Sequence, residues 1–168
     1  MRLRMQTITR KYHFVFHLLF GAIVAVYHYN LIPDVQVFKL IIVALLGSTV
    51  PDIDHLFYIY FYGRTTELAK ELRKHIKDKQ LRKFVQSVSL NHKNNNYIFS
   101  HNIVAVLLAL GLAYLFYQYD HDYLSVFFSA WLFHYIFDIC EDILYFGKVN
   151  QNWWLKFKKE ISSIQKVD

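Results

Sequence analysis

The sequence predicts an all-α, polytopic membrane protein in which four transmembrane helices form two hairpins, with a basic amphipathic cytoplasmic helix between them. Apolar residues make up 55% of the 168 residues, with 15 phenylalanines and 13 tyrosines, which is too apolar for a soluble domain of this size. Two prolines and five glycines are few enough to leave long helices uninterrupted. The net charge is +6, and the basic residues are confined to a few segments. We expect residues 1–168 to form a single integral membrane domain.

Four apolar segments approach the ~20 residues that a helix needs to cross the hydrocarbon core of a bilayer. Short polar turns join the first segment to the second and the third to the fourth, so each pair is predicted to form a helical hairpin. Tyrosine and tryptophan gather near the segment ends, as in the aromatic belts of membrane proteins. The predicted spans are residues 12–29, 35–52, 97–117 and 123–146.

The positions of the charges predict the orientation of the helices, since lysine and arginine collect in cytoplasmic segments. Of the 19 basic residues, all except Lys39 lie in the amino-terminal segment, the middle segment 63–96 or the tail 147–168. The charged residues of the two short turns are all acidic. We therefore expect a multi-pass protein of the inner, cytoplasmic membrane with both termini in the cytoplasm.

The middle segment 63–96 combines apolar residues at helical spacing with lysines and arginines on the other face, and Thr65 or Thr66 can cap its start. Two interpretations stay open: a solvated charged helix that enforces topology, which we favour, or a helix that lies on the anionic inner leaflet. The tail around Trp153 and Trp154 also combines apolar residues with lysines, so the same two interpretations apply to it. Membrane lipids are expected partners, and nucleic acid is not, because the membrane rule already accounts for the positive charge.

Several ionisable residues lie inside the predicted spans, where each charged side chain costs roughly 2.5–3.5 kcal/mol on insertion scales. At ~1.5 Å rise per residue they fall at one level, in the inner third of the membrane. Histidines and carboxylates together suit Zn²⁺, or alternatively Mn²⁺ or Fe²⁺, and the number of carboxylates permits one ion or two. The predicted metal ligands are His17, Asp52, Asp54, His55, His101, His134 and Asp138.

The main rival to a metal site is a salt-bridged polar core that fixes helix packing. That rival explains a single histidine–aspartate pair well, but it explains seven groups at one depth less well. His13, nearer the inner surface, is a weaker candidate than His17. Glu141 and Asp142 are either supporting groups of the site or surface charges.

These motifs, in this order, resemble a known family. The segments that carry the resemblance are His17-Leu18-Leu19-Phe20, Pro51-Asp52-Ile53-Asp54-His55, Ser100-His101 and His134-x-x-x-Asp138. Over residues 13–145 the chain resembles the membrane-bound, metal-dependent hydrolases of bacteria and archaea, the YdjM-like family, whose best-known member is described as LexA-binding. The resemblance implies a multi-helix inner-membrane protein with hydrolytic activity and with the seven metal ligands named above.

The chain departs from the family pattern just before His101. The family usually reads His-Arg-x-x-Thr-His-Ser, whereas residues 96–102 of this chain read Asn-Tyr-Ile-Phe-Ser-His-Asn. The first histidine and the arginine are therefore missing, and His92 can replace that histidine only if the loop folds back. The difference bears on catalytic turnover more than on metal binding.

The sequence predicts a membrane-embedded, metal-dependent hydrolase that acts on a phosphoester of a lipid or lipid-like molecule at the cytoplasmic side. Asp54 or His92 is the expected general base. The alternative is a non-catalytic, metal-stabilised small membrane protein that serves as a subunit or scaffold, with a membrane-protein partner or a second copy of itself. Ion or proton transport is a weaker third hypothesis, since no repeat or discontinuous helix is visible.

Overall fold

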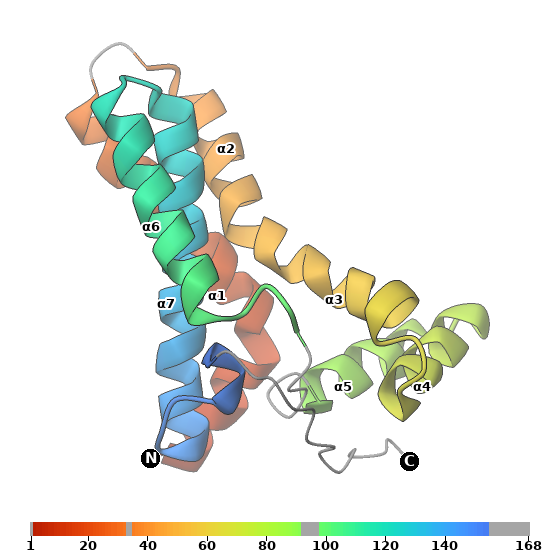
Figure 1. Cartoon of the computed structure of the whole chain (residues 1–168). Coiled ribbons are helices and arrows are strands. Elements are labelled where there is room, and N and C mark those ends of the chain that lie inside the picture. Colours follow the sequence, from red (N-terminus) through yellow and green to blue (C-terminus); the bar gives the residue numbers. More distant parts are fainter. Residues whose placement is uncertain (1, 33–34, 92–97, 155–168) are drawn as a thin grey trace.

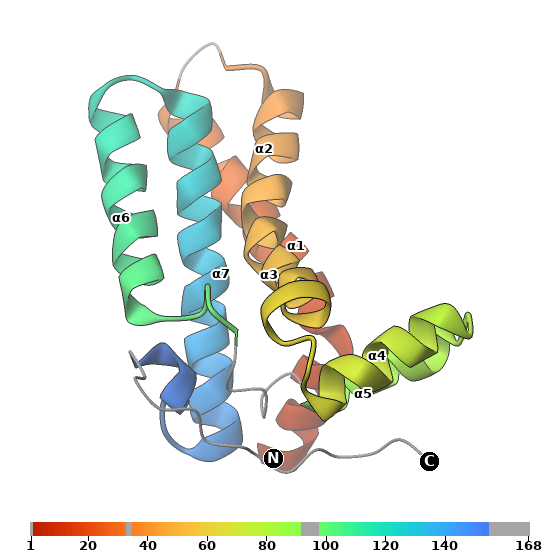
Figure 2. The ribbon, with the colours of Figure 1, turned by 45° about the vertical axis from the view of Figure 1, so that its right-hand side comes forward.

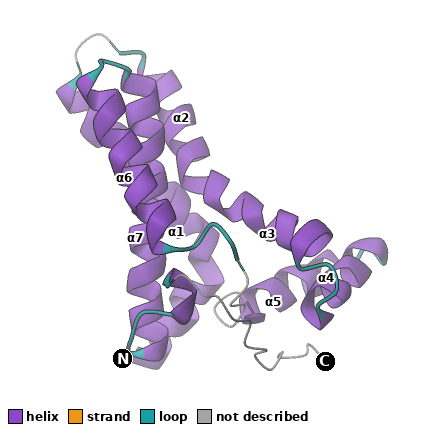
Figure 3. Cartoon of the chain, viewed as in Figure 1, coloured by secondary structure: helices purple, strands orange, loops and turns teal. Residues whose placement is uncertain are grey.

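The structure, a computed structural model, describes residues 2–32, 35–91 and 98–154, and these residues form helices and short connections with no strand (Figures 1 and 3). The predicted all-α class is confirmed. The long helices of the bundle are α1 (Arg2–Leu31), α2 (Val37–Thr49), α6 (Ile103–Gln118) and α7 (Asp122–Phe146).

Three helical stretches are long and apolar enough to cross a membrane: Lys11–Leu31, Val37–Tyr62 and Asp122–Phe146. The fourth predicted span corresponds to α6, which is apolar but has only 16 residues. At 1.5 Å per residue, its length of about 24 Å falls short of the ~30 Å hydrocarbon core. Length and composition therefore support three of the four predicted spans, and the fourth stays a prediction.

The second span is longer than predicted. The chain stays helical from Val37 to Tyr62, because α2 is followed by a 3-10 turn (Val50–Asp52), by α3 (Ile53–Phe57) and by a π-helical turn (Tyr58–Tyr62). Pro51 stands in the first turn of the 3-10 segment, where its missing N–H is tolerated. The helix therefore continues past the predicted end of the span at residue 52, because the polar run turns into the bundle.

Helix α7 is central to the bundle: it packs against α1, α2 and α6, and α1 also packs against α2 (Figure 2). Small and branched apolar side chains fill one end of this interface, including Ala44 and Ala130. Gly47 brings α2 close to α7, because a Cβ there would lie only 2.2 Å from the carbonyl oxygen of Phe127. This close approach places the end of α2 against the middle of α7.

The middle segment forms two helices, α4 (Glu67–Lys77) and α5 (Leu81–Asn91), and not the single amphipathic helix that was predicted. Lys79 adopts a left-handed conformation with φ 56°, which reverses the chain between them. Thr66 caps α4, since its hydroxyl oxygen accepts a 3.3 Å hydrogen bond from the N–H of Ala69. The pair packs on the end of the Val37–Tyr62 helix and extends to one side of the bundle (Figure 1).

Candidate metal centre

Ionisable side chains from four separate segments meet in the bundle. Helix α1 supplies two of them, the Val37–Tyr62 stretch supplies two, the connection before α6 supplies one and α7 supplies three. The members of this cluster are His13, His17, Asp52, His55, His101, His134, Asp138 and Glu141.

His13 and His17 lie one turn apart on the same face of α1. Their Nε2 atoms are 2.9 Å apart, and His13 Nδ1 lies 2.9 Å from a carboxylate oxygen of Glu141. Tyr12, with φ −114° and ψ 19°, kinks the helix just before this pair. His17 is fully buried, whereas the His13 side chain keeps 17% of its exposure, so the pair runs from the interior toward the surface.

Asp138 is the carboxylate around which the imidazoles gather. Its Oδ2 lies 3.1 Å from Nε2 of His101 and 3.3 Å from Nε2 of His134. Its Oδ1 lies 3.7 Å from Nε2 of His13 and 3.8 Å from Nε2 of His17. Asp138 is only 1% exposed, so one buried carboxylate is placed between two pairs of imidazoles.

The ring of His134 is oriented by α2. Its Nδ1 lies 2.8 Å from the carbonyl oxygen of Ser48, and a carbonyl can only accept, so Nδ1 carries the proton of this hydrogen bond. Nε2 then faces Asp138, Asp52 and the Nε2 of His101, which is 3.5 Å away. Metal-binding histidines characteristically donate their other ring N–H to such an outer group.

Asp52 and His55 lie three residues apart, with Asp52 Oδ1 3.7 Å from Nε2 of His55 and 3.7 Å from Nε2 of His134. His101 was expected one turn inside the third helix, and this expectation is wrong. It lies in the connection before α6, which begins at Ile103 and is capped by Asn102. Because the connection is not helical, the imidazole of His101 can turn inward to reach Asp138.

Asp54 has a different partner from the other predicted ligands. Its Oδ2 accepts a 2.6 Å hydrogen bond from the backbone N–H of Ser100, and it belongs to none of the metal groups found in the described residues. The contact ties the second span to the connection that carries His101, whose Nδ1 is 2.9 Å from Ser100 Oγ. The other predicted general base, His92, lies outside the described residues.

The donor atoms fit a divalent metal. Four overlapping sets of three residues each bring their ligand atoms within 4.8 Å of one another. A tetrahedral Zn²⁺ with bonds of 2.0–2.1 Å separates its ligand atoms by roughly 3.3 Å. The separations above run from 2.9 to 3.8 Å. The four sets are His13–His17–Asp52, His17–His134–Asp138, Asp52–His55–His101 and His13–Asp138–Glu141.

Two members of the cluster, His13 and Glu141, are not among the seven predicted ligands. Spacing is the signal that points to them, since His13 precedes His17 by four residues and Glu141 follows Asp138 by three. Residues three or four apart share a helix face, so each lies beside a predicted ligand. His13 is a weaker candidate in the sequence because it lies nearer the inner surface, whereas Glu141 is left open between a supporting group and a surface charge.

Comparison with known protein families matches residues 13–153 to the family described as YdjM inner membrane protein, and this region includes the whole cluster. No curated protein and no solved structure matches the chain. The match extends over most of the chain and confirms the resemblance seen in the motifs. The chain therefore belongs to the YdjM inner membrane protein family.

Proposed function

We propose that this protein is a membrane-embedded, metal-dependent hydrolase that cleaves a phosphoester of a lipid or lipid-like molecule at the cytoplasmic side of the inner membrane. One observation carries the proposal: imidazoles and carboxylates from four segments converge inside an apolar bundle. Burying such groups is costly, and coordination of a divalent cation offsets that cost.

The proposal includes α6 as a fourth span, with both termini in the cytoplasm. Helix α6 packs along α7, which is long enough to cross the membrane. Its outward side chains Val104, Leu107 and Leu108 are apolar and at least half exposed, which suits contact with lipid. A short span can be accommodated by local thinning of the bilayer. The positions of the basic residues support this orientation.

The cluster divides into two groups of ligands that meet at Asp138. His13, Glu141 and Asp138 form one group near α1, Asp52, His55 and His101 form the other, and Asp52 also forms a set with His13 and His17. A divalent ion held there would supply Lewis acidity toward a phosphoryl oxygen and would lower the pKa of a bound water to about 7. Asp138 reaches imidazoles on both sides, so it would be a ligand common to both groups.

Some side chains of the cluster lie nearer the protein surface than others. The side chains of His13, Asp52 and His55 keep between 17% and 23% of their exposure, whereas His17 and His134 are fully buried. A substrate would approach the exposed edge, while the buried imidazoles form the inner wall. The hydrogen bond from Ser100 favours a positioning role for Asp54 over the predicted role as general base.

A second candidate is a non-catalytic, metal-stabilised subunit of a membrane assembly. The departure from the family pattern favours it, because Asn96 and Tyr97 replace the usual histidine and arginine. The guanidinium that would neutralise an anionic substrate is then missing from that position. Metal binding itself is common to both candidates.

The deciding experiment measures metal content and hydrolysis on the same purified protein. The chain is loaded with Zn²⁺ or Mn²⁺, analysed for bound metal and assayed with phosphatidic acid and with a generic phosphodiester. His134→Ala should lose both bound metal and activity, while His121→Gln, which changes an exposed histidine outside the cluster, should keep both. Metal without turnover favours the subunit, and absence of metal at saturating concentration contradicts both candidates.

A further inference from the structure

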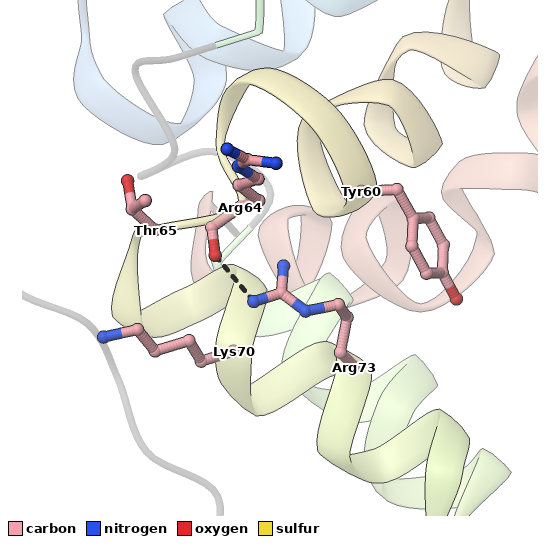
Figure 4. Close-up of a pocket in the computed structure, with 5 residues that line it drawn as sticks. All are labelled: Tyr60, Arg64, Thr65, Lys70 and Arg73. Carbon is pink, nitrogen blue, oxygen red and sulfur yellow. Dashed lines mark hydrogen bonds between the residues drawn. The ribbon is translucent and has the colours of Figure 1, made fainter.

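A second polar site lies where the Val37–Tyr62 helix ends and α4 begins. A pocket of about 450 Å³ opens there, and none of its lining residues belongs to the metal cluster. In Figure 4 the guanidinium of Arg73 reaches the backbone of Arg64, while the other side chains surround this contact and point in different directions. The lining residues are Tyr60, Arg64, Thr65, Lys70 and Arg73.

The backbone of the turn holds this arrangement in place. The π-helical turn Tyr58–Tyr62 ends at Gly63, where a Cβ would lie 2.3 Å from the ring of Tyr58. That tyrosine in turn lies 2.7 Å, oxygen to oxygen, from Thr66, the cap of α4. Residues 64–65 therefore lie in a short turn of the chain that leads into α4. Helical π-turns are frequent at functional sites.

Arg73 is pre-organised inside the pocket. One of its terminal nitrogens donates to the carbonyl oxygen of Ile59 and the other to that of Arg64, at 2.6 Å in the second case (Figure 4). A guanidinium has five N–H groups, so these two bonds leave further donors directed outward. A planar guanidinium held in place matches phosphate oxygens better than a mobile ammonium does.

The pocket carries an excess of positive charge. Arg64, Lys70 and Arg73 contribute three cations, and Glu67 pairs with one of them, at 2.6 Å from Lys70 Nζ. Both partners of that ion pair are largely exposed, so the pair contributes little to stability and breaks readily. The hydroxyls of Tyr60 and Thr65 add neutral donors, which suits an anion with several oxygens.

The position of the pocket indicates where the anion comes from. It lies at the end of a helix that is long and apolar enough to cross the membrane, and the exposed rings of Phe57, Phe61 and Tyr62 surround that end. Exposed tyrosines at a helix end, here Tyr60 and Tyr62, mark the level of the lipid headgroups. We propose that this pocket binds the phosphate of an anionic phospholipid from the surrounding leaflet, independently of the metal centre.

The test measures lipid binding by native mass spectrometry on the full chain in detergent. Phosphatidylglycerol should bind in preference to phosphatidylcholine. Arg64→Gln should reduce the binding of phosphatidylglycerol roughly tenfold, the loss expected for one charge-assisted hydrogen bond. Lys83→Gln removes the same charge from an exposed position on α5 outside the pocket and should change binding less than about twofold.

Two further comparisons separate a phosphate site from a general effect of charge or of unfolding. Arg73→Lys keeps the charge but loses the planar donor, so weaker binding with unchanged metal content supports a built phosphate site. Arg64→Gln leaves the backbone bonds of Arg73 in place, so its effect does not depend on unfolding of α4. Equal binding of the two lipids, or equal losses in Arg64→Gln and Lys83→Gln, would overturn the proposal. So would arginine-dependent binding of inorganic phosphate without binding of phosphatidylglycerol.

Discussion

The indole N–H of Trp153 donates a 2.7 Å hydrogen bond to the carboxylate of Asp142, and both side chains are buried. The ring of Trp153 lies 5.9 Å from that of His101 and 5.7 Å from that of Tyr135, measured between centroids. These contacts hold the segment that follows α7 against the imidazole nearest to Asp138. The carboxyl-terminal part of the described chain therefore packs against the candidate metal centre from outside it.

Trp153→Phe should lower metal affinity without unfolding the bundle. It removes the N–H donor but keeps an apolar ring, so His101 loses an ordered neighbour while the core stays filled. Groups that orient metal ligands typically contribute about 10–100-fold in affinity, and we expect the lower end of that range. Competition with a chromogenic chelator measures the change. Trp154→Phe is the matched control because that indole is 60% exposed, and equal affinities in the two variants would contradict the role of Trp153.

Asp138→Asn should lose far more metal than Asp54→Asn. The carboxylate of Asp138 lies within 3.1–3.8 Å of four imidazoles, whereas that of Asp54 accepts a hydrogen bond from the backbone of Ser100. An amide oxygen is a weaker ligand than a carboxylate for a divalent ion, but it can still accept from an N–H. Elemental analysis of both purified variants provides the comparison. If Asp54→Asn lost the metal and Asp138→Asn kept it, the arrangement of the ligands around Asp138 would be contradicted.

The amino-acid pattern predicts helices better than it predicts where they end. Helix α7 starts within one residue of the predicted position, and it ends at the predicted residue 146, since a polar turn precedes it and Gly147 follows in a left-handed conformation with φ 72°. The second span runs past Asp52, because that side chain is turned toward partners on other helices. Sequence shows the polarity of such a residue but not the tertiary partner that allows the helix to continue.

The sequence also indicates only part of the candidate site. Helical spacing and depth are local properties, and they pointed to His17, His134 and Asp138, which the structure brings together. The position of His101 outside α6 and the separate role of Asp54 depend on how the connection at residues 98–102 folds against the second span. No periodicity in the sequence records that contact, so these roles required the structure.

Gly47→Ala should destabilise the protein and disturb the metal site. The added Cβ would lie 2.2 Å from the carbonyl oxygen of Phe127, so α2 must move away from α7 and take the Ser48 carbonyl away from His134. Overpacking of this kind typically costs about 1–3 kcal/mol. Gly111→Ala is the control, because nothing lies within 4 Å of the Cβ position there. Thermal unfolding in detergent should separate the two variants, and equal melting temperatures would show that the α2–α7 contact is adaptable.

Removal of the metal should lower the melting temperature of the protein, and this result separates a metal centre from a salt-bridged polar core. A ligand that binds only the folded state stabilises it by about 2.7 kcal/mol at one hundred times its dissociation constant. The protein should therefore unfold at a lower temperature when a chelator removes the ion from the buried group of His17, His134 and Asp138. Its melting temperature should rise again when Zn²⁺ is restored. In a salt-bridged core the same imidazoles would be held by proton-dependent ion pairs with Asp138, so the chelator would leave the melting temperature unchanged. The comparison needs no substrate, so it distinguishes the two interpretations even if the hydrolase assay detects no activity.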